Sequence, residues 1–243
     1  MFAVDPARKL MFNMAAKSGS MALAEMFLEH SGDLERWPGR RKQAIHEFRR
    51  QLLKSQGMGA GAVRELLLGP GRSDWVVIKF VRNPYSRAVS SYLHVVLHPL
   101  ALFEPFEEIA AEPGDLSFLA FLRHVTVMDV WKANVHYRPQ ALPYEGDIDP
   151  PLDHIARIED LADEVVAINR RFGTAFLMAE PREGRRRDTK AVATDEIAAT
   201  VPFRRLAAGW PPYRQFYDED TRALVEQIYA EDIARYPYSF DEV

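Results

Sequence analysis

The chain has 243 residues and a mass of 27.8 kDa, with 31 lysines and arginines, 35 acidic residues, a formal net charge of −4 and no cysteine. This length suits one medium-to-large domain or two small ones, and an apolar fraction of 47% is ordinary for a globular protein. Without cysteine, the chain has no disulfides, thiolate metal sites or cysteine nucleophiles. The acidic balance argues against nucleic acid as the main partner.

The start of the chain lacks the apolar core of a signal peptide, because Asp5, Pro6, Arg8 and Lys9 fall within its first ten residues. No run of about 18 apolar residues appears anywhere, so we expect no transmembrane segment and an intracellular, soluble protein.

The first predicted unit is strand, turn, helix. Residues Leu10 to Ala16 form an apolar run that ends in the polar turn Lys17-Ser18-Gly19-Ser20. Apolar residues then recur at helical spacing as far as Gly32, which is a typical stop signal.

A second unit of the same kind begins with the β-branched run Trp75 to Val81. Arg82 follows the strand directly, and Ser86 to Leu97 has the pattern of a helix. Pro84 near the helix start fits the first turn, where the missing N–H of proline costs nothing.

The later elements alternate in the same way. We predict strands over His154 to Ile158 and Ala175 to Met178, and helices over Leu161 to Phe172 and Asp218 to Tyr236. Gly57 to Ser73, which is glycine-rich around a short helical patch, is predicted as a surface connection, and Leu142 to Pro151 as a loop. Strands alternating with helices predict an α/β fold, a single domain over residues 1–243 with a central parallel sheet flanked by helices.

Both sharp turns follow strands of the predicted parallel sheet, where helix N-termini offer free N–H groups to anions. The first turn is not the signature of a P-loop NTPase, because Lys17 precedes Gly19 and no earlier glycine exists. In the second unit Arg87 and Ser90 share a helix face, and Arg82 can reach the same region. A guanidinium beside a hydroxyl suits a phosphate group.

Together the two turns resemble the cofactor signature of sulfotransferases. The chain has Lys-Ser-Gly-Ser at residues 17–20 and Val-Arg-Asn-Pro-Tyr-Ser-Arg-Ala-Val-Ser-Ser-Tyr at residues 81–92. The resemblance implies that the first turn grips the 5′-phosphosulfate of 3′-phosphoadenosine 5′-phosphosulfate (PAPS), and that Arg82 and Ser90 grip its 3′-phosphate. It also implies a P-loop-like sulfotransferase fold. The residues so assigned to PAPS are Lys17, Ser18, Gly19, Ser20, Met21, Arg82 and Ser90.

Further motifs are similar to the carbohydrate branch of that family. They are His-Tyr-Arg-Pro-Gln at residues 136–140, Ile-Ala-Arg-Ile-Glu-Asp-Leu at 155–161, and the close from Tyr229 to Phe240. The resemblance implies a carbohydrate or glycoconjugate acceptor. The family's eukaryotic members are usually anchored in a membrane and contain cysteine. This chain has no cysteine and no expected membrane anchor, which favours a bacterial cytoplasmic enzyme.

The resemblance and the chemistry both assign Lys17 to the leaving phosphate oxygen, as a cation that stabilises developing charge. The base is left open between His136, His46 and Glu25, of which His136 is preferred because it lies in a motif and imidazole has a suitable pKa. A sulfuryl group carries less charge than a phosphoryl group, so we expect no metal requirement. His94 and His98, four residues apart, are a weak metal candidate.

Two basic clusters stand out, over Arg36 to Lys54 and over Arg182 to Lys190. The first suits either an anionic acceptor or plain solvated surface. The resemblance implies that a basic loop near the second closes over the cofactor.

Two alternative functions stay open: a nucleotide-dependent kinase of the P-loop type, and a non-catalytic anion-binding or polysaccharide-binding protein.

Overall fold

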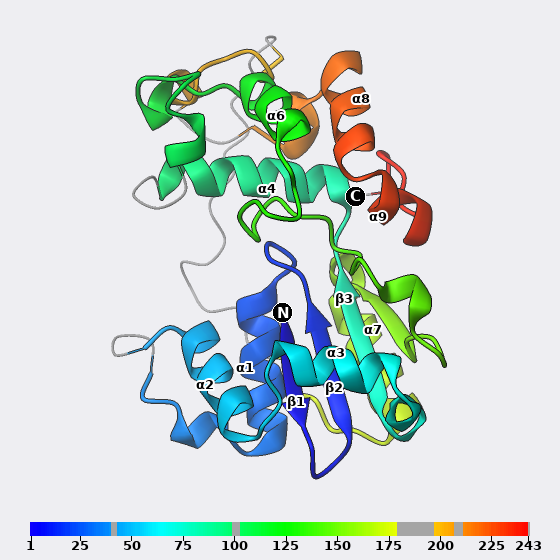
Figure 1. Cartoon of the computed structure of the whole chain (residues 1–243). Coiled ribbons are helices and arrows are strands. Elements are labelled where there is room, and N and C mark those ends of the chain that lie inside the picture. Colours follow the sequence, from blue (N-terminus) through cyan, green and yellow to red (C-terminus); the bar gives the residue numbers. More distant parts are fainter. Residues whose placement is uncertain (40–42, 99–102, 179–196, 207–210, 243) are drawn as a thin grey trace. The chain divides into compact units, whose positions relative to one another are not determined.

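A computed structural model describes residues 1–39, 43–98, 103–178, 197–206 and 211–242. The chain divides into two compact units (Figure 1). We call Met1–Arg82 with Leu142–Pro181 the sheet unit, and Asn83–Ala141 with Arg182–Val243 the helical unit. None of the described helices combines the length and apolar character needed to cross a membrane.

The sheet unit is built on four strands in the order β1-β2-β3-β4. Strands β2 (Leu10–Met14), β3 (Val76–Val81) and β4 (His154–Arg157) are parallel, with Phe12 opposite Ile78 and Phe80 opposite Ala156. Strand β1 (Phe2–Asp5) joins β2 in antiparallel pairing. The prediction of an α/β fold with a mainly parallel central sheet flanked by helices is therefore confirmed.

Two apolar layers cover the two faces of this sheet. On one face, alternate strand residues such as Phe12 and Phe80 pack against α1 (Ser20–Ser31), α2 (Ile45–Ser55) and α7 (Leu161–Phe172). On the other face, Met11 and Val77 pack against α3 (Ala60–Leu68). Figure 1 shows α3 lying across the sheet. This alternation follows from the two-residue period of side chains along a strand.

The helical unit packs α4 (Pro84–Leu97), α6 (Phe118–Val127), α8 (Glu219–Ile228) and α9 (Ala230–Arg235) around one apolar core. Aromatic rings dominate that core. Tyr92 lies among Phe118, Phe121 and Phe216, and its hydroxyl donates to the Leu116 carbonyl. The start of α4 is as expected, with Pro84 in the first turn and the Asn83 side chain accepting from the N–H groups of Tyr85 and Ser86.

Several predicted boundaries are confirmed closely. Helix α1 ends at Gly32, whose φ of 79° lies in the left-handed region that glycine adopts at low cost. Helix α7 spans the predicted residues, and β2, β3 and β4 lie within the predicted runs.

Three expectations differ from the structure. Residues 175–178 are not a strand, because the Asn169 side chain takes up both backbone groups of Phe176. The predicted helix from Asp218 to Tyr236 is broken at Tyr229, which ends α8 and precedes α9. The short helical patch expected between Gly57 and Ser73 is present as α3, but it is not a surface connection, because it buries Val63 and Leu67 against the sheet. The prediction of one domain over residues 1–243 stays a prediction.

Candidate active site

The turn after β2 has an unusual backbone. Lys17 has a φ of 67° and Gly19 a φ of 68°, so two left-handed residues flank Ser18 just before α1 begins at Ser20. For lysine this conformation costs about 1–2 kcal/mol, a strain that clusters at ligand sites. Gly19 stands at the N-cap of α1 and, as glycine, supplies no side-chain cap to the first N–H groups of the helix. These N–H groups can therefore meet an anion.

The side chains of this turn differ in exposure. The Ser18 hydroxyl is buried and Ser20 is 8% exposed, whereas Lys17 is half-buried and Met21 is 55% exposed. The turn therefore presents a cation at an accessible edge beside two largely shielded hydroxyls.

Arg82 lies beside the same turn. It is half-buried, and its Nη1 donates to the Lys17 carbonyl at 3.0 Å. The parallel register of β2 and β3 explains the meeting, because the segments leaving two adjacent parallel strands emerge at one edge of the sheet. The structure thus brings together Lys17 and Arg82, 65 residues apart in the chain.

His46 also reaches the turn, from the first turn of α2. Its Nε2 lies 3.2 Å from the Ser20 hydroxyl. Arg49, one turn further along α2, is only 4% exposed, and burial lowers its pKa to about 10, with a further contribution from Arg50. Glu25 is 3% exposed within α1. The first basic cluster is therefore not simply a solvated surface at Arg49; its residues 40–42 lie outside the described part.

In the helical unit, α4 carries two residues that the sequence suggested for a phosphate group, Ser90 and Arg87, and they differ in exposure. Ser90 is half-buried. Arg87 is fully buried, donates to the Arg138 carbonyl at 2.6 Å and lies over the Tyr229 ring. Arg87 therefore supports the segment around Arg138. The neighbouring Ser91, also buried, lies 2.6 Å from the His136 carbonyl as a hydrogen-bond donor.

The His136 side chain has a defined partner. The Asn134 side-chain oxygen accepts from the His136 backbone N–H at 3.2 Å and lies 2.6 Å from the ring Nδ1. Because that oxygen is an acceptor, the proton of the neutral ring sits on Nδ1 and the basic lone pair on Nε2. The ring also contacts His94 in a tilted arrangement, with 4.2 Å between centroids.

The segment from His136 to Ala141 is held at its other end by the C-terminal motif. The Asp232 carboxylate is fully buried and accepts from the backbone N–H groups of Gln140 at 2.7 Å and Ala141 at 2.8 Å. The Tyr229 hydroxyl, whose pKa burial raises to about 12, donates to the Tyr137 carbonyl at 3.2 Å. Motifs that are far apart in the sequence therefore converge on one short segment.

The two histidines of the weak metal candidate contact each other in a tilted arrangement, with the His94 and His98 centroids 4.8 Å apart. Among the described residues, no group of three or more histidines and acids is arranged to hold a metal ion. The second basic cluster, from Arg182 to Lys190, lies outside the described residues.

Sequence reasoning missed Asn134 and Ser91, and it ranked His46 low. Asn134 carries a recognisable signal, since asparagine two residues before a turn residue commonly accepts its N–H. Ser91 and His46 give no such signal, because their partners, His136 and Ser20, are 45 and 26 residues away.

Comparison with known proteins agrees with these motifs. A sequence model described as the sulfotransferase family matches residues 1–239. No curated protein and no solved structure gives a match. Since the match spans nearly the whole chain, and the mainly parallel sheet is consistent with the sulfotransferase fold, this chain belongs to the sulfotransferase family.

Proposed function

We propose that the protein transfers a sulfuryl group from PAPS to a hydroxyl of a carbohydrate. The observation that carries the proposal is the turn Lys17 to Ser20. Its left-handed residues precede the start of α1, where the N-cap Gly19 has no side chain to cap the helix, and Arg82 donates to the Lys17 carbonyl. An anion-binding helix start with a half-buried lysine suits a phosphosulfate.

The residues present fit this co-substrate. The backbone of Gly19 to Met21 and the hydroxyls of Ser18 and Ser20 would bind its 5′ side. Arg82 and Ser90, both within the motif of residues 81–92, are assigned to its 3′-phosphate on that motif. PAPS supplies the activated sulfuryl group.

Lys17 would stabilise the negative charge that develops on the leaving phosphate oxygen. Removing such a preorganised donor typically slows group transfer by about 10²–10³-fold. His136 would accept the proton of the attacking hydroxyl at Nε2, with Nδ1 held by Asn134. By analogy with phosphoryl transfer, the remaining task is positioning, and we propose no metal requirement. A bacterial cytoplasmic setting stays a prediction of the sequence resemblance.

The direct test is transfer from labelled PAPS to a panel of oligosaccharides, glycolipids and small phenols. We expect transfer to at least one carbohydrate and loss of transfer in Lys17→Ala. Transfer to phenols alone would contradict the proposal of a carbohydrate acceptor, while the proposal of PAPS as the sulfuryl donor would stand. Transfer that is undiminished in Lys17→Ala would contradict the role of Lys17.

Calorimetric titration separates this proposal from its alternatives. The sulfotransferase proposal expects binding of adenosine 3′,5′-bisphosphate without metal, whereas a kinase would prefer ATP with Mg²⁺. A non-catalytic binding protein would bind ligand yet show no turnover with any acceptor. The match to the sulfotransferase family favours the first outcome.

A further inference from the structure

A polar pocket of about 500 Å³ lies in the helical unit, beside the segment that carries His136. Its walls come from the 3-10 helix Glu104–Phe106 and from residues 128–137. The side chains that give it chemistry are Glu104, Asp129, Lys132, Asn134 and Tyr137. No motif considered above assigns this pocket a ligand.

We propose that this pocket binds the acceptor, and that the acceptor is an uncharged or amine-bearing polyol such as a neutral or amino sugar. The inference rests on the proposed sulfuryl transfer and goes beyond it by naming the acceptor's charge class. Three observations support it: the link of the pocket to His136, its donors and acceptors, and its charge.

The link to His136 is Asn134. This residue lines the pocket, while its side-chain oxygen accepts from the backbone of His136 and faces the ring Nδ1. Because the oxygen is engaged on the His136 side, the amide NH₂ is the part of Asn134 that can meet a ligand. A sugar in the pocket would thus contact the residue that orients the proposed base.

The polar groups suit hydroxyls. Carboxylates accept hydrogen bonds from sugar hydroxyls, and ammonium and amide groups donate to them. Asp129 and Lys132 face each other at 3.0 Å, and the hydrogen bond from Lys132 is the main cause that lowers the pKa of Asp129. The pocket therefore offers carboxylate acceptors and an ammonium donor side by side.

The charge of the lining discriminates among sugars. Two carboxylates, Glu104 and Asp129, and one ammonium, Lys132, line the pocket, so these side chains sum to a formal charge of −1. A polyuronate would meet like charge here, whereas a neutral sugar would not and an amine would gain attraction.

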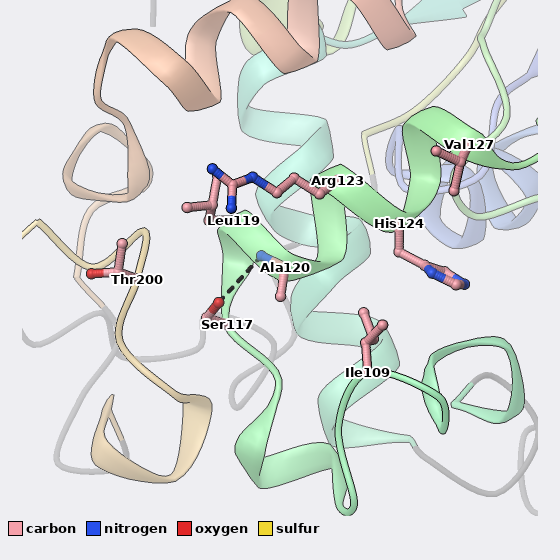
Figure 2. A pocket seen from close by; sticks show the side chains of 8 residues that line it. All are labelled: Ile109, Ser117, Leu119, Ala120, Arg123, His124, Val127 and Thr200. Carbon is pink, nitrogen blue, oxygen red and sulfur yellow. Dashed lines mark hydrogen bonds between the residues drawn. The ribbon is translucent and has the colours of Figure 1, made fainter.

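A second pocket, of about 360 Å³, is less suited to this role (Figure 2). It lies along α6, where Arg123 and His124 accompany Ile109, Leu119 and Val127. The Ser117 hydroxyl in its wall already caps α6 by accepting from Ala120. None of its lining residues belongs to the segment from Asn134 to Ala141.

The test uses three tetrasaccharides of equal length: tetra-N-acetylchitotetraose, its deacetylated amine form and tetragalacturonate. Binding is measured by calorimetry without donor, and transfer is measured with labelled PAPS. We expect the neutral and amine forms to bind and accept sulfate, with the uronate at least about tenfold weaker. Glu104→Lys should weaken binding of the amine form about tenfold and strengthen that of the uronate.

Glu104→Gln, which removes charge and keeps shape, should show a smaller change in the same direction. Glu112→Gln is the matched control, since this exposed glutamate lies in the same unit outside the pocket lining. A preference for the uronate, or identical acceptor binding in Glu104→Lys and the unaltered protein, would overturn the inference. Failure to bind adenosine 3′,5′-bisphosphate would instead overturn the proposed function. The two failures can be told apart, because acceptor binding is measured in a separate titration without donor.

Discussion

The Ser20 hydroxyl lies 3.2 Å from Nε2 of His46, a contact between the first residue of α1 and the first turn of α2. The contact reaches the turn proposed to hold the 5′ side of PAPS. Ser20 is nearly buried, so its hydroxyl has few directions available to it. A positioning role for His46 follows, through Ser20 rather than on the co-substrate itself.

Replacing His46 should therefore weaken co-substrate binding without abolishing it. We expect His46→Leu to raise the dissociation constant of adenosine 3′,5′-bisphosphate by up to about tenfold, the value of one hydrogen bond. His46→Gln can place a polar atom near the position of Nε2 and should recover most of the loss. Calorimetric titration measures both. Equal losses in the two variants would mean that His46 acts only by packing.

Lys17 combines a catalytic charge with backbone strain, and two substitutions separate these effects. Lys17→Ala and Lys17→Gly should both reduce transfer by about 10²–10³-fold, because both remove the cation. Glycine adopts a φ of 67° without strain, so Lys17→Gly should be more stable than Lys17→Ala by up to about 1 kcal/mol. Urea unfolding and a transfer assay on the same preparations give both values. Equal stability of the two variants would mean that the turn relaxes.

The neighbours Ser90 and Ser91 form a matched pair on α4. Ser91→Ala should lower the free energy of unfolding by about 1–3 kcal/mol, because the His136 carbonyl loses a buried donor. Ser90→Ala should change stability by less than about 0.5 kcal/mol, as expected at a partly exposed position. The same variant should weaken bisphosphate binding. Reversed effects in urea unfolding would contradict the assignment of the two serines.

Asn134 should influence the pH dependence of transfer if it orients the base. In Asn134→Asp a carboxylate replaces the amide oxygen facing Nδ1 and favours the charged imidazole, so the acid limb of the pH–rate profile should move up by about one pH unit. Asn134→Leu should lower kcat and leave bisphosphate binding unchanged. An acid limb that stays in place in Asn134→Asp would argue against His136 as the base.

Tyr229 predicts an alkaline loss of stability. Burial raises its pKa from 10.0 to about 12, so the folded protein keeps this phenol protonated where the unfolded chain has begun to lose the proton. The contribution is complete below pH 10 and is lost as the pH rises through about 12. The Tyr229→Phe variant lacks this pH-dependent contribution to stability, and it also lacks the hydrogen bond to the Tyr137 carbonyl.

Urea unfolding of this variant at pH 8 and at pH 10.5 provides the check. The Phe variant should be less stable than the unaltered protein by about 1 kcal/mol at pH 8, with a smaller difference at the higher pH. A difference that stays constant with pH would show that Tyr229 titrates alike in both states.

Local sequence patterns predicted most of the sheet unit well. Strands β2 and β3 are continuous apolar runs and α7 has a clear helical period, so burial on known faces defines them. Strand β1 was not predicted, because it is a four-residue edge strand beside charged residues, and α3 was expected only as a short helical patch in a glycine-rich surface connection. Their stability comes from pairing with β2 and packing on the sheet, which no local window contains.

The candidate site divides in the same way. The sequence by itself determined which residue types could bind a phosphosulfate, because Lys17 to Ser20 and Arg82 to Ser90 are contiguous motifs that follow strands. Only the tertiary structure decided what the surrounding polar residues do. Arg87 donates a hydrogen bond to the Arg138 carbonyl. The Asp232 carboxylate accepts from the backbone N–H groups of Gln140 and Ala141. The His46 ring lies within hydrogen-bond distance of the Ser20 hydroxyl. The physical reason is that a hydrogen bond depends on distance in space, and these partners are 26 to 92 residues apart in the chain.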